Sequence, residues 1–238
     1  MKLSTKEWTC LDPDVGVWAR TYSFTTSAFS NCFVVRIGES ELAVISPPRK
    51  LGSGDFESLD ALGKVVAICA PNGLHHLGIP GFVERYPEAT LYTDAVSAKR
   101  IAKQQPSLPS FRPTEELASQ LPDHVKIFSA PMLKRPDMMA RVDTGKGYIW
   151  YSNDVLGNSP NLPKPWLLGK LFKWSRSGPG YTVNRLVLKY LGPQAGFGDW
   201  LKGEFEAHPP CKVVVGHGHV FDEGDVAAKS REVLNAGF

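Results

Sequence analysis

The chain has 238 residues, of which 42% are hydrophobic and 21% are charged, and its 27 basic and 24 acidic side chains leave a formal net charge of +3. This apolar content exceeds that of a disordered chain, and no apolar run approaches the roughly 18 residues that span a bilayer. The composition therefore excludes disorder and integral membrane insertion, and it predicts a globular protein with a single domain over residues 1–238.

The cysteines and the N-terminus indicate the compartment. Cys10, Cys32, Cys69 and Cys211 occur singly, which favours neither a disulfide framework nor a zinc site built of cysteines alone. Residues 1–8 carry positive charge without a continuous apolar stretch behind it, so they lack the pattern of a secretory signal. We expect a cytoplasmic protein in a reducing compartment.

The first part of the chain predicts two or three antiparallel strands. Short β-type runs cover residues 18–24, 32–37 and 42–45, and the turn residues 38–40 separate the last two runs. A helix-like stretch follows at 56–62.

A rhythm of strand, loop and helix then begins. Residues 65–70 form an apolar, branched run typical of a buried strand, 90–93 precede a helical stretch at 95–103, and 212–215 precede a helical C-terminus at 225–234. Two further strands are expected at 125–128 and 148–151. The pattern predicts an α/β (α+β) protein with two β-rich layers and helices outside them.

One segment departs from the average charge. Between Val155 and Gly198 there is no acidic residue but there are six basic ones, and the apolar residues of 166–174 recur at helical spacing. The simplest interpretation is an amphipathic helix that packs on the core with its basic face in water. Alternatives are a membrane-surface helix, a nucleic-acid patch, or a lid over an anionic substrate.

Among these alternatives we favour a basic, aromatic lid-like insertion at about 157–195, because it follows a candidate acidic ligand, Asp154. Trp174, Arg176 and Arg185 are then the candidate substrate-binding residues. A net charge of only +3 disfavours nucleic acid as a partner and favours a small molecule.

Histidines follow two of the predicted buried strands. His75 and His76 come after 65–70, His217 and His219 come after 212–215, and Asp154 follows the strand at 148–151. Ligands collect at the C-terminal ends of strands in open sheets. Imidazoles with one carboxylate suit zinc or iron better than magnesium or calcium.

The order of three motifs, "APNGLHHLGIPGF", "YSNDVLG" and "VVVGHGHVF", resembles the metallo-β-lactamase-fold superfamily. In that family the first loop reads H-x-H-x-D-H, the second motif carries a metal-bridging aspartate, and the third carries a histidine before a closing helix. The resemblance implies a four-layer αββα sandwich and an uncharacterised branch in which the first motif is degenerate.

The departures from the family pattern imply that the first of its two metal sites is lost. Pro71 and Gly73 occupy the positions of the two leading histidines, His75 occupies that of the aspartate, and the loop "SAPMLKRPDMM" has no histidine. The resemblance leaves a second site with one divalent ion, zinc or else iron. Its predicted ligands are His75, His76, Asp154 and His217.

Three functions fit these residues. The first is a mononuclear metal-dependent hydrolase acting on an ester, lactone, thioester or phosphoester, in which Asp154 binds the ion or accepts a proton and His219 shuttles it. The second is a non-catalytic metal- or ligand-binding protein that retains the fold. The third, an iron-dependent redox protein or dioxygenase, is disfavoured because no flavin-binding domain and no full ligand set are found.

Overall fold

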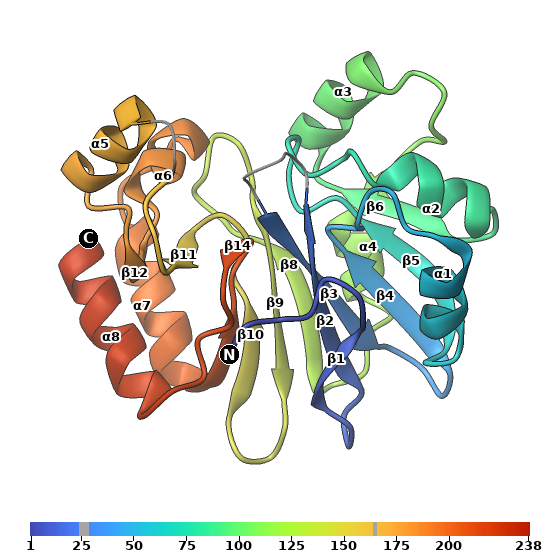
Figure 1. Cartoon of the computed structure of the whole chain (residues 1–238), viewed down its shortest axis with the longest axis horizontal. Helices are drawn as coiled ribbons and strands as arrows, with labels where there is room; N and C mark the ends of the chain where they lie inside the picture. The colour runs from blue at the N-terminus through green and yellow to red at the C-terminus, as the bar shows by residue number, and fades with distance from the viewer. Residues whose placement is uncertain (24–28, 164–165) are drawn as a thin grey trace.

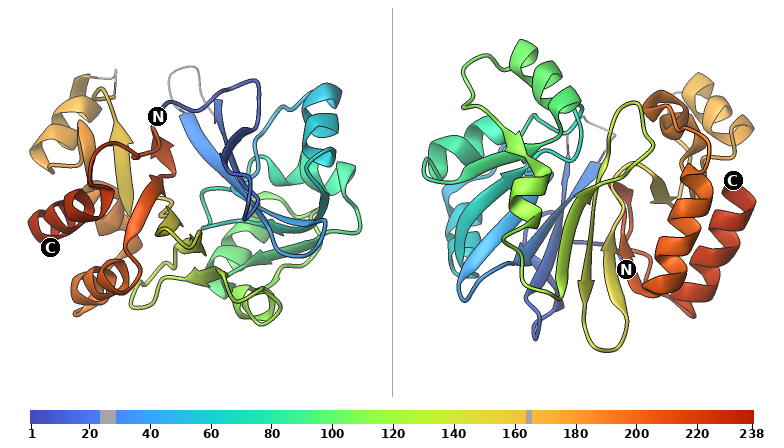
Figure 2. Two further views of the ribbon diagram at one scale, coloured as in Figure 1. Left: turned by 90° about the horizontal axis from the view of Figure 1, so that it is seen from below. Right: turned by 180° about the vertical axis from the view of Figure 1, so that it is seen from behind.

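The computed structural model describes residues 1–23, 29–163 and 166–238, which form two large sheets face to face with helices on both outer sides (Figures 1 and 2). The first sheet has seven strands in sequence order, β1 to β7. Neighbours from β1 to β4 are antiparallel, and those from β4 to β7 are parallel. The strands are β1 (Thr9–Asp12), β2 (Val17–Ser23), β3 (Phe29–Arg36), β4 (Glu41–Ile45), β5 (Lys64–Cys69), β6 (Thr90–Thr93) and β7 (Arg112–Pro113).

The second sheet has the order β13-β10-β9-β8, in which only the pair β10 and β13 is parallel. A small third sheet, β12-β11-β14, continues from it. The strands are β8 (Val125–Ser129), β9 (Met138–Asp143), β10 (Tyr148–Tyr151), β11 (Leu156–Ser159), β12 (Gly180–Val183), β13 (Pro210–Val214) and β14 (His217–Gly218).

Helices cover the outer face of each sheet (Figure 1). Helices α1, α2 and α3 lie on the first sheet, α4 lies by β8 at the far end of the two sheets, and α7 and α8 lie on the second sheet. The helices are α1 (Ser53–Asp60), α2 (Ile79–Arg85), α3 (Ala95–Gln104), α4 (Thr114–Ala118), α5 (Trp166–Trp174), α6 (Arg185–Leu191), α7 (Phe197–Ala207) and α8 (Val226–Gly237).

Three separate apolar cores account for this layering. In β3, Phe33 and Val35 point into the core between the sheets, whereas Cys32 and Val34 point into the core under α1, α2 and α3. A strand buried on both faces requires apolar residues at successive positions, as residues 32–35 of β3 and 42–45 of β4 provide. The third core lies between the second sheet and α6, α7 and α8. The predicted αββα sandwich of the metallo-β-lactamase type is confirmed.

The predicted elements match the structure closely, with residue 24 of the strand 18–24 outside the described residues. The packing of the helix at 166–174 was predicted wrongly. Helix α5 buries Gly169 and partly buries Phe172, while Trp166 and Trp174 are 69% and 83% exposed. The helix contacts the rest of the protein through Gly169, where an added Cβ would lie 2.9 Å from the Pro163 carbonyl oxygen. Because this glycine faces inward, the apolar stripe of the helix faces outward.

The two sheets are joined at the edge where β5, β10 and β13 end. Asn31, at the start of β3, donates its backbone N–H to the Gly216 carbonyl oxygen at 2.9 Å. Its buried side chain donates to the carbonyl oxygens of Val215 and Gly218, both at 2.8 Å. These bonds hold the loop after β13 against the first sheet, and the loops after β5 and β10 open at the same edge.

Candidate metal centre

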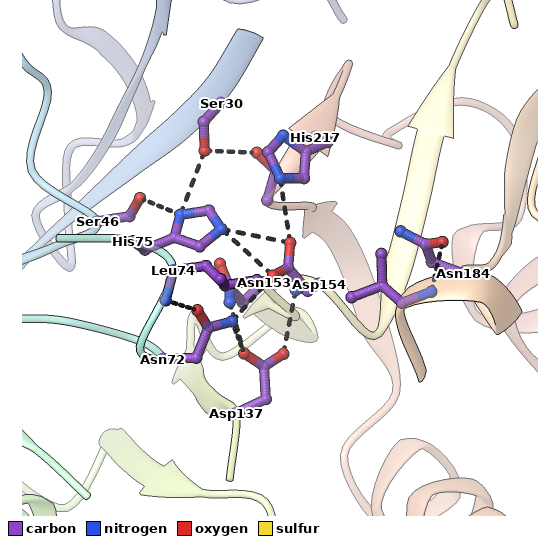
Figure 3. A network of polar contacts seen from close by, with 12 residues as sticks. Ser30, Ser46, Asn72, Leu74, His75, Asp137, Asn153, Asp154, Asn184 and His217 are labelled. Carbon is purple, nitrogen blue, oxygen red and sulfur yellow. Dashed lines mark hydrogen bonds and ion pairs between the residues drawn. The ribbon is translucent and has the colours of Figure 1, made fainter. Parts of the chain in front are cut away.

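Side chains from two loops and one short strand meet at this edge (Figure 3). His75 comes from the loop after β5, Asp154 from the loop after β10, and His217 from the start of β14, which follows β13. The Nε2 atom of His75 lies 3.3 Å from the Asp154 carboxylate, and Nε2 of His217 lies 3.1 Å from Asp154 Oδ1. All three potential ligand atoms lie within 4.8 Å of one another.

A backbone carbonyl orients His217. Its Nδ1 lies 2.7 Å from the carbonyl oxygen of Phe29, which can only accept, so Nδ1 carries the proton. In the neutral ring this leaves the lone pair of Nε2 directed at Asp154. The flanking Gly218 has a φ of +118°, and an added Cβ there would clash with the Asn158 carbonyl oxygen. Glycine is therefore required for the backbone to place His217 at this point.

Two hydroxyls orient His75. Its Nδ1 lies 2.9 Å from Ser46 Oγ, which in turn lies 2.8 Å from the hydroxyl of Tyr22. Burial raises the pKa of Tyr22 to about 12, so Tyr22 remains a neutral donor to Ser46. Ser46 can then accept the Nδ1 proton of His75, and Nε2 of His75 is left free to face Asp154.

A buried polar network holds Asp154 from the other side. Its Oδ2 accepts the side-chain N–H of Asn72 at 2.9 Å, and the same amide donates to Asp137 Oδ1 at 2.7 Å. Asp137 also accepts from the side chain of Asn153 at 2.5 Å and from the backbone N–H of Asp154 at 3.1 Å. Because every side-chain hydrogen bond of Asp137 goes to Asn72, Asn153 or Asp154, it is a positioning residue for the site.

The surroundings of the two carboxyls in the site shift their pKa values in opposite directions. Burial alone would raise the pKa of Asp154, but His75 and His217 hold it well below its usual range. Burial and then the negative charge of Asp154 raise the pKa of Asp137 well above its usual range. For His217, burial is outweighed by the hydrogen bond and charge of Asp154, which raise its pKa. The site thus favours the ionised form at Asp154 more than at Asp137.

The donor set fits a divalent metal ion. For a tetrahedral ion with ligand distances of about 2.0–2.1 Å, neighbouring ligand atoms lie about 3.3 Å apart. The separations of 3.1 and 3.3 Å between the histidine nitrogens and Asp154 match this value. Both Nδ1 atoms have oxygen partners outside the site, which is the arrangement that orients metal-binding histidines in general. Two imidazoles and one carboxylate leave a fourth position open.

The structure places the other two predicted histidines apart from this group. His76 is buried, but its ring approaches Gln104 and Arg100 of α3, and its Nδ1 has no hydrogen-bond partner among the described residues. Neighbouring side chains in this loop thus point to opposite sides. His219 is half-buried, and its backbone N–H and carbonyl both bond to Asn158.

The predicted substrate residues also lie away from the group. Trp174 and Arg176 are exposed on and after α5, and Arg185 donates to the carbonyl oxygen of Ala236 at the C-terminal helix. One of the cations expected in this segment, Lys164, is outside the described residues.

Sequence reasoning missed the residues that orient the ligands. Asn72 and Asn153 directly precede predicted ligand loops, and Ser46 follows a predicted strand, so their positions offered a weak signal. Asp137 immediately precedes β9, a strand that the sequence did not predict, so nothing indicated that it would be buried.

The comparisons with known proteins bear on the fold. The chain matches no family model, and it matches no curated protein. Among solved structures it is similar to the DIM-1 metallo-β-lactamase, with 12% identity, a TM-score of 0.59, and coverage of 99% of this chain and 98% of the other. It is also similar to metallo-β-lactamases from Erythrobacter litoralis (12%, TM-score 0.60, 96% of each chain) and Pontibacter korlensis (13%, TM-score 0.59, 96% and 98%).

These similarities define the class of the protein by its fold. The chain is a divergent protein of the metallo-β-lactamase fold, over almost its whole length. At identities of 12–13% the fold alone is shared. The activity must therefore be argued from the residues of this chain.

Proposed function

We propose that the protein is a hydrolase that uses a single divalent metal ion, zinc or else iron, held by His75, Asp154 and His217. The observation that carries this proposal is the convergence of two Nε2 atoms on one carboxylate, with both Nδ1 atoms anchored outside the site. A buried ion pair of this kind without an ion would serve stability poorly, because desolvation offsets the attraction.

The site's own residues suggest how the reaction proceeds. A divalent ion supplies a Lewis acid that acidifies water and polarises an ester, lactone, thioester or phosphoester group. Asp154 contributes Oδ1 beside both histidines, while Asn72 holds its Oδ2. Asp154 thereby binds the ion or takes a proton.

The residues at the family's first site support a single ion rather than two. Pro71 and Gly73 offer no ligand atom in their side chains, and the carbonyl oxygen of Pro71 accepts the backbone N–H of Met138. The described residues hold one group of histidines and carboxylates with metal-binding spacing. One ion with one open position is enough to activate water.

Metal content and hydrolysis test the proposal together. The untagged protein purified without chelator should contain about one zinc or iron per chain by elemental analysis, as expected for a three-residue site. His75→Ala and Asp154→Asn should lose the ion and at least about 100-fold of the esterase, lactonase or phosphodiesterase activity. His124→Ala is the matched control, since His124 is exposed and distant in sequence.

The rival function is a non-catalytic metal- or ligand-binding protein, favoured by the loss of the two leading histidines. Metal in the wild type, lost in both variants, with no hydrolysis of any of these substrate classes would favour this rival. The absence of metal from the wild type after incubation with zinc and iron would overturn the metal-dependent function altogether.

A further inference from the structure

A cavity of about 550 Å³ lies next to the candidate metal centre. Its lining comes from the loop that precedes His75, from helix α3, from the loop before β9 and from the end of α6. The residues that matter most here are Asn72, Gly73, Lys99, Arg100, Lys103 and Arg135.

The cavity carries an uncompensated positive charge. Four basic side chains and no acidic one line it: Lys99, Arg100, Lys103 and Arg135. Within residues 1–23, 29–163 and 166–238, none of these four makes a salt bridge, although ten ion pairs occur elsewhere in that part of the chain. Cations that converge without a counter-charge in a concave site produce a strong local potential for anions.

Two of the cations are held in place. Arg135 donates from Nη1 to the Tyr190 carbonyl oxygen at 2.5 Å, and its guanidinium stacks on the Tyr190 ring at 4.6 Å. Arg100 donates from Nε to the Gly73 carbonyl oxygen at 3.1 Å, which leaves its two terminal nitrogens directed elsewhere. Preorganised guanidinium groups suit the tetrahedral oxygens of a phosphoryl group, which they bind through paired hydrogen bonds.

Asn72 contacts both the cavity and the candidate metal centre. This residue lines the cavity, and its side-chain N–H contacts Asp154 Oδ2 at 2.9 Å. One side chain, that of Asn72, thus lies between the cavity and the Asp154 carboxylate.

We propose that this cavity binds a phosphoryl group of the substrate, so that the protein acts on a phosphorylated small molecule whose ester, thioester or lactone bond lies at the metal centre. The inference rests on the hydrolase function proposed above and specifies its substrate class. The phosphoryl group is an anchor and is not cleaved.

Calorimetric titration with phenylphosphonate, whose carbon–phosphorus bond resists hydrolysis, tests this binding without turnover. Lys99→Gln/Lys103→Gln should weaken binding at least about tenfold, the factor expected for each lost charge-assisted hydrogen bond. The control Lys126→Gln/Lys146→Gln removes the same charge from two exposed lysines and should bind like the wild type. Benzoate should bind more weakly than phenylphosphonate, because it carries less charge.

The outcomes separate the two proposals. Binding that is lost in the cavity variant and retained in Asp154→Asn supports the phosphoryl site, even if the wild type holds no metal and the hydrolase proposal fails. A wild type that binds zinc but not phenylphosphonate would overturn the phosphoryl site alone. Equal affinity in the cavity variant and the control variant, or a preference for benzoate, would also overturn it.

An independent feature is the outward face of α5. Five of its nine residues are large exposed apolar side chains: Trp166, Leu167, Leu168, Leu171 and Trp174. At 100° per residue, Trp174, Leu167 and Leu171 fall within an arc of about 60°. The helix stands at the periphery of the molecule, beside α6 (Figure 1).

Basic residues border this apolar face. Lys170, whose Nζ lies 4.3 Å from the Trp166 ring centre, Lys173 and Arg176 are all exposed, and no acidic residue occurs from Val155 to Gly198. An apolar strip with aromatic residues and flanking cations is typical of helices that lie in the interface of an anionic bilayer. In the described residues, no helix is long and apolar enough to cross a membrane.

We infer that α5 docks the protein on the surface of membranes that contain anionic lipid. The wild type should sediment with vesicles of phosphatidylcholine and phosphatidylglycerol but only weakly with phosphatidylcholine alone. Leu167→Ser/Trp174→Ser should abolish sedimentation, whereas Leu77→Ser/Val96→Ser, which removes two exposed apolar side chains elsewhere, should not.

Failure of the wild type to sediment with the anionic vesicles, or equal sedimentation of the α5 variant, would overturn the membrane surface as partner. A concentration-dependent dimer that the α5 variant loses would overturn it as well, since the face would then be covered by a second copy of the chain.

Discussion

Removal of the Asp137 carboxylate should destabilise the protein more than any change at a ligand. Asp137 is fully buried and accepts hydrogen bonds from Asn72, Asn153 and the backbone of Asp154. Asp137→Ala leaves these three donors without an acceptor in a place that water does not reach. At about 1–3 kcal/mol for each unsatisfied donor, and less than full additivity, the loss in unfolding free energy is about 3–6 kcal/mol.

Asp137→Asn removes the charge of the side chain but keeps one of its two acceptor oxygens. Its amide oxygen can still accept from Asn72 and Asn153, but its NH2 group then faces the backbone N–H of Asp154. One donor out of three is lost, so we expect a cost of about 1–3 kcal/mol. Relief of the repulsion between two buried carboxyls, which raises the pKa of Asp137, reduces this cost further.

Urea unfolding followed by circular dichroism at neutral pH measures both changes. Asp143→Ala serves as the control, because Asp143 is only half-buried and bonds to Gly145 and Tyr148 where water can replace it, and the change should cost no more than about 1 kcal/mol. If Asp137→Ala costs less than about 1 kcal/mol, or as little as Asp143→Ala, the network around Asp154 does not stabilise the site as described.

Three further predictions concern the glycine loop, an ion pair and the metal. Gly218→Ala should cost about 3 kcal/mol or more in urea unfolding, because it combines positive-φ strain with a clash against β11, whereas Gly224→Ala, also at positive φ but in open space, should cost about 1 kcal/mol. Burial opposes ionisation of Asp55, but the Gly52 N–H and the Arg20 guanidinium lower the pKa of Asp55 below 3.8. The stability this provides is complete above the unfolded pKa and disappears as the pH falls through the folded one. The wild type should therefore lose more unfolding free energy between neutral pH and acid pH than Asp55→Asn does. Parallel pH profiles of the two proteins would show that the Arg20–Asp55 ion pair does not stabilise the fold. Zinc at about 100-fold above its Kd should raise the melting temperature by about 5–10 °C in the wild type, a gain of about 2.7 kcal/mol, and should leave Asp154→Asn unchanged.

The sandwich could be predicted because its strands are buried on both faces. Residues 32–35 of β3, 42–45 of β4 and 65–69 of β5 form continuous apolar runs, which distinguishes these strands from surface strands. The strands β9, β11 and β12 were not predicted, because polar residues or glycines interrupt them. Their pairing with neighbours distant in sequence determines their conformation more than their own composition does.

The candidate ligands were predictable only in part. A histidine after a buried strand can be recognised from sequence, but the choice between His75 and His76 depends on the backbone of one loop. The Ser46 hydroxyl at the end of β4 bonds to His75, and the Gln104 side chain bonds to His76. These two partners determine which histidine faces Asp154. Neither partner is near the histidines in the sequence, so no local pattern could show them.

The histidine at the family's aspartate position changes the electrostatics of the centre. With His75 in that place, the three proposed ligands contribute a single carboxylate, Asp154, whose pKa His75 and His217 hold well below its usual range. A divalent ion bound there would keep a net positive charge of about one unit, which attracts an anionic substrate and strengthens the acidifying effect on water. The four unpaired cations of the adjacent cavity act in the same direction. A neutral substrate gains nothing from either feature, so the charge of the site and the charge of the cavity favour the same class of substrate.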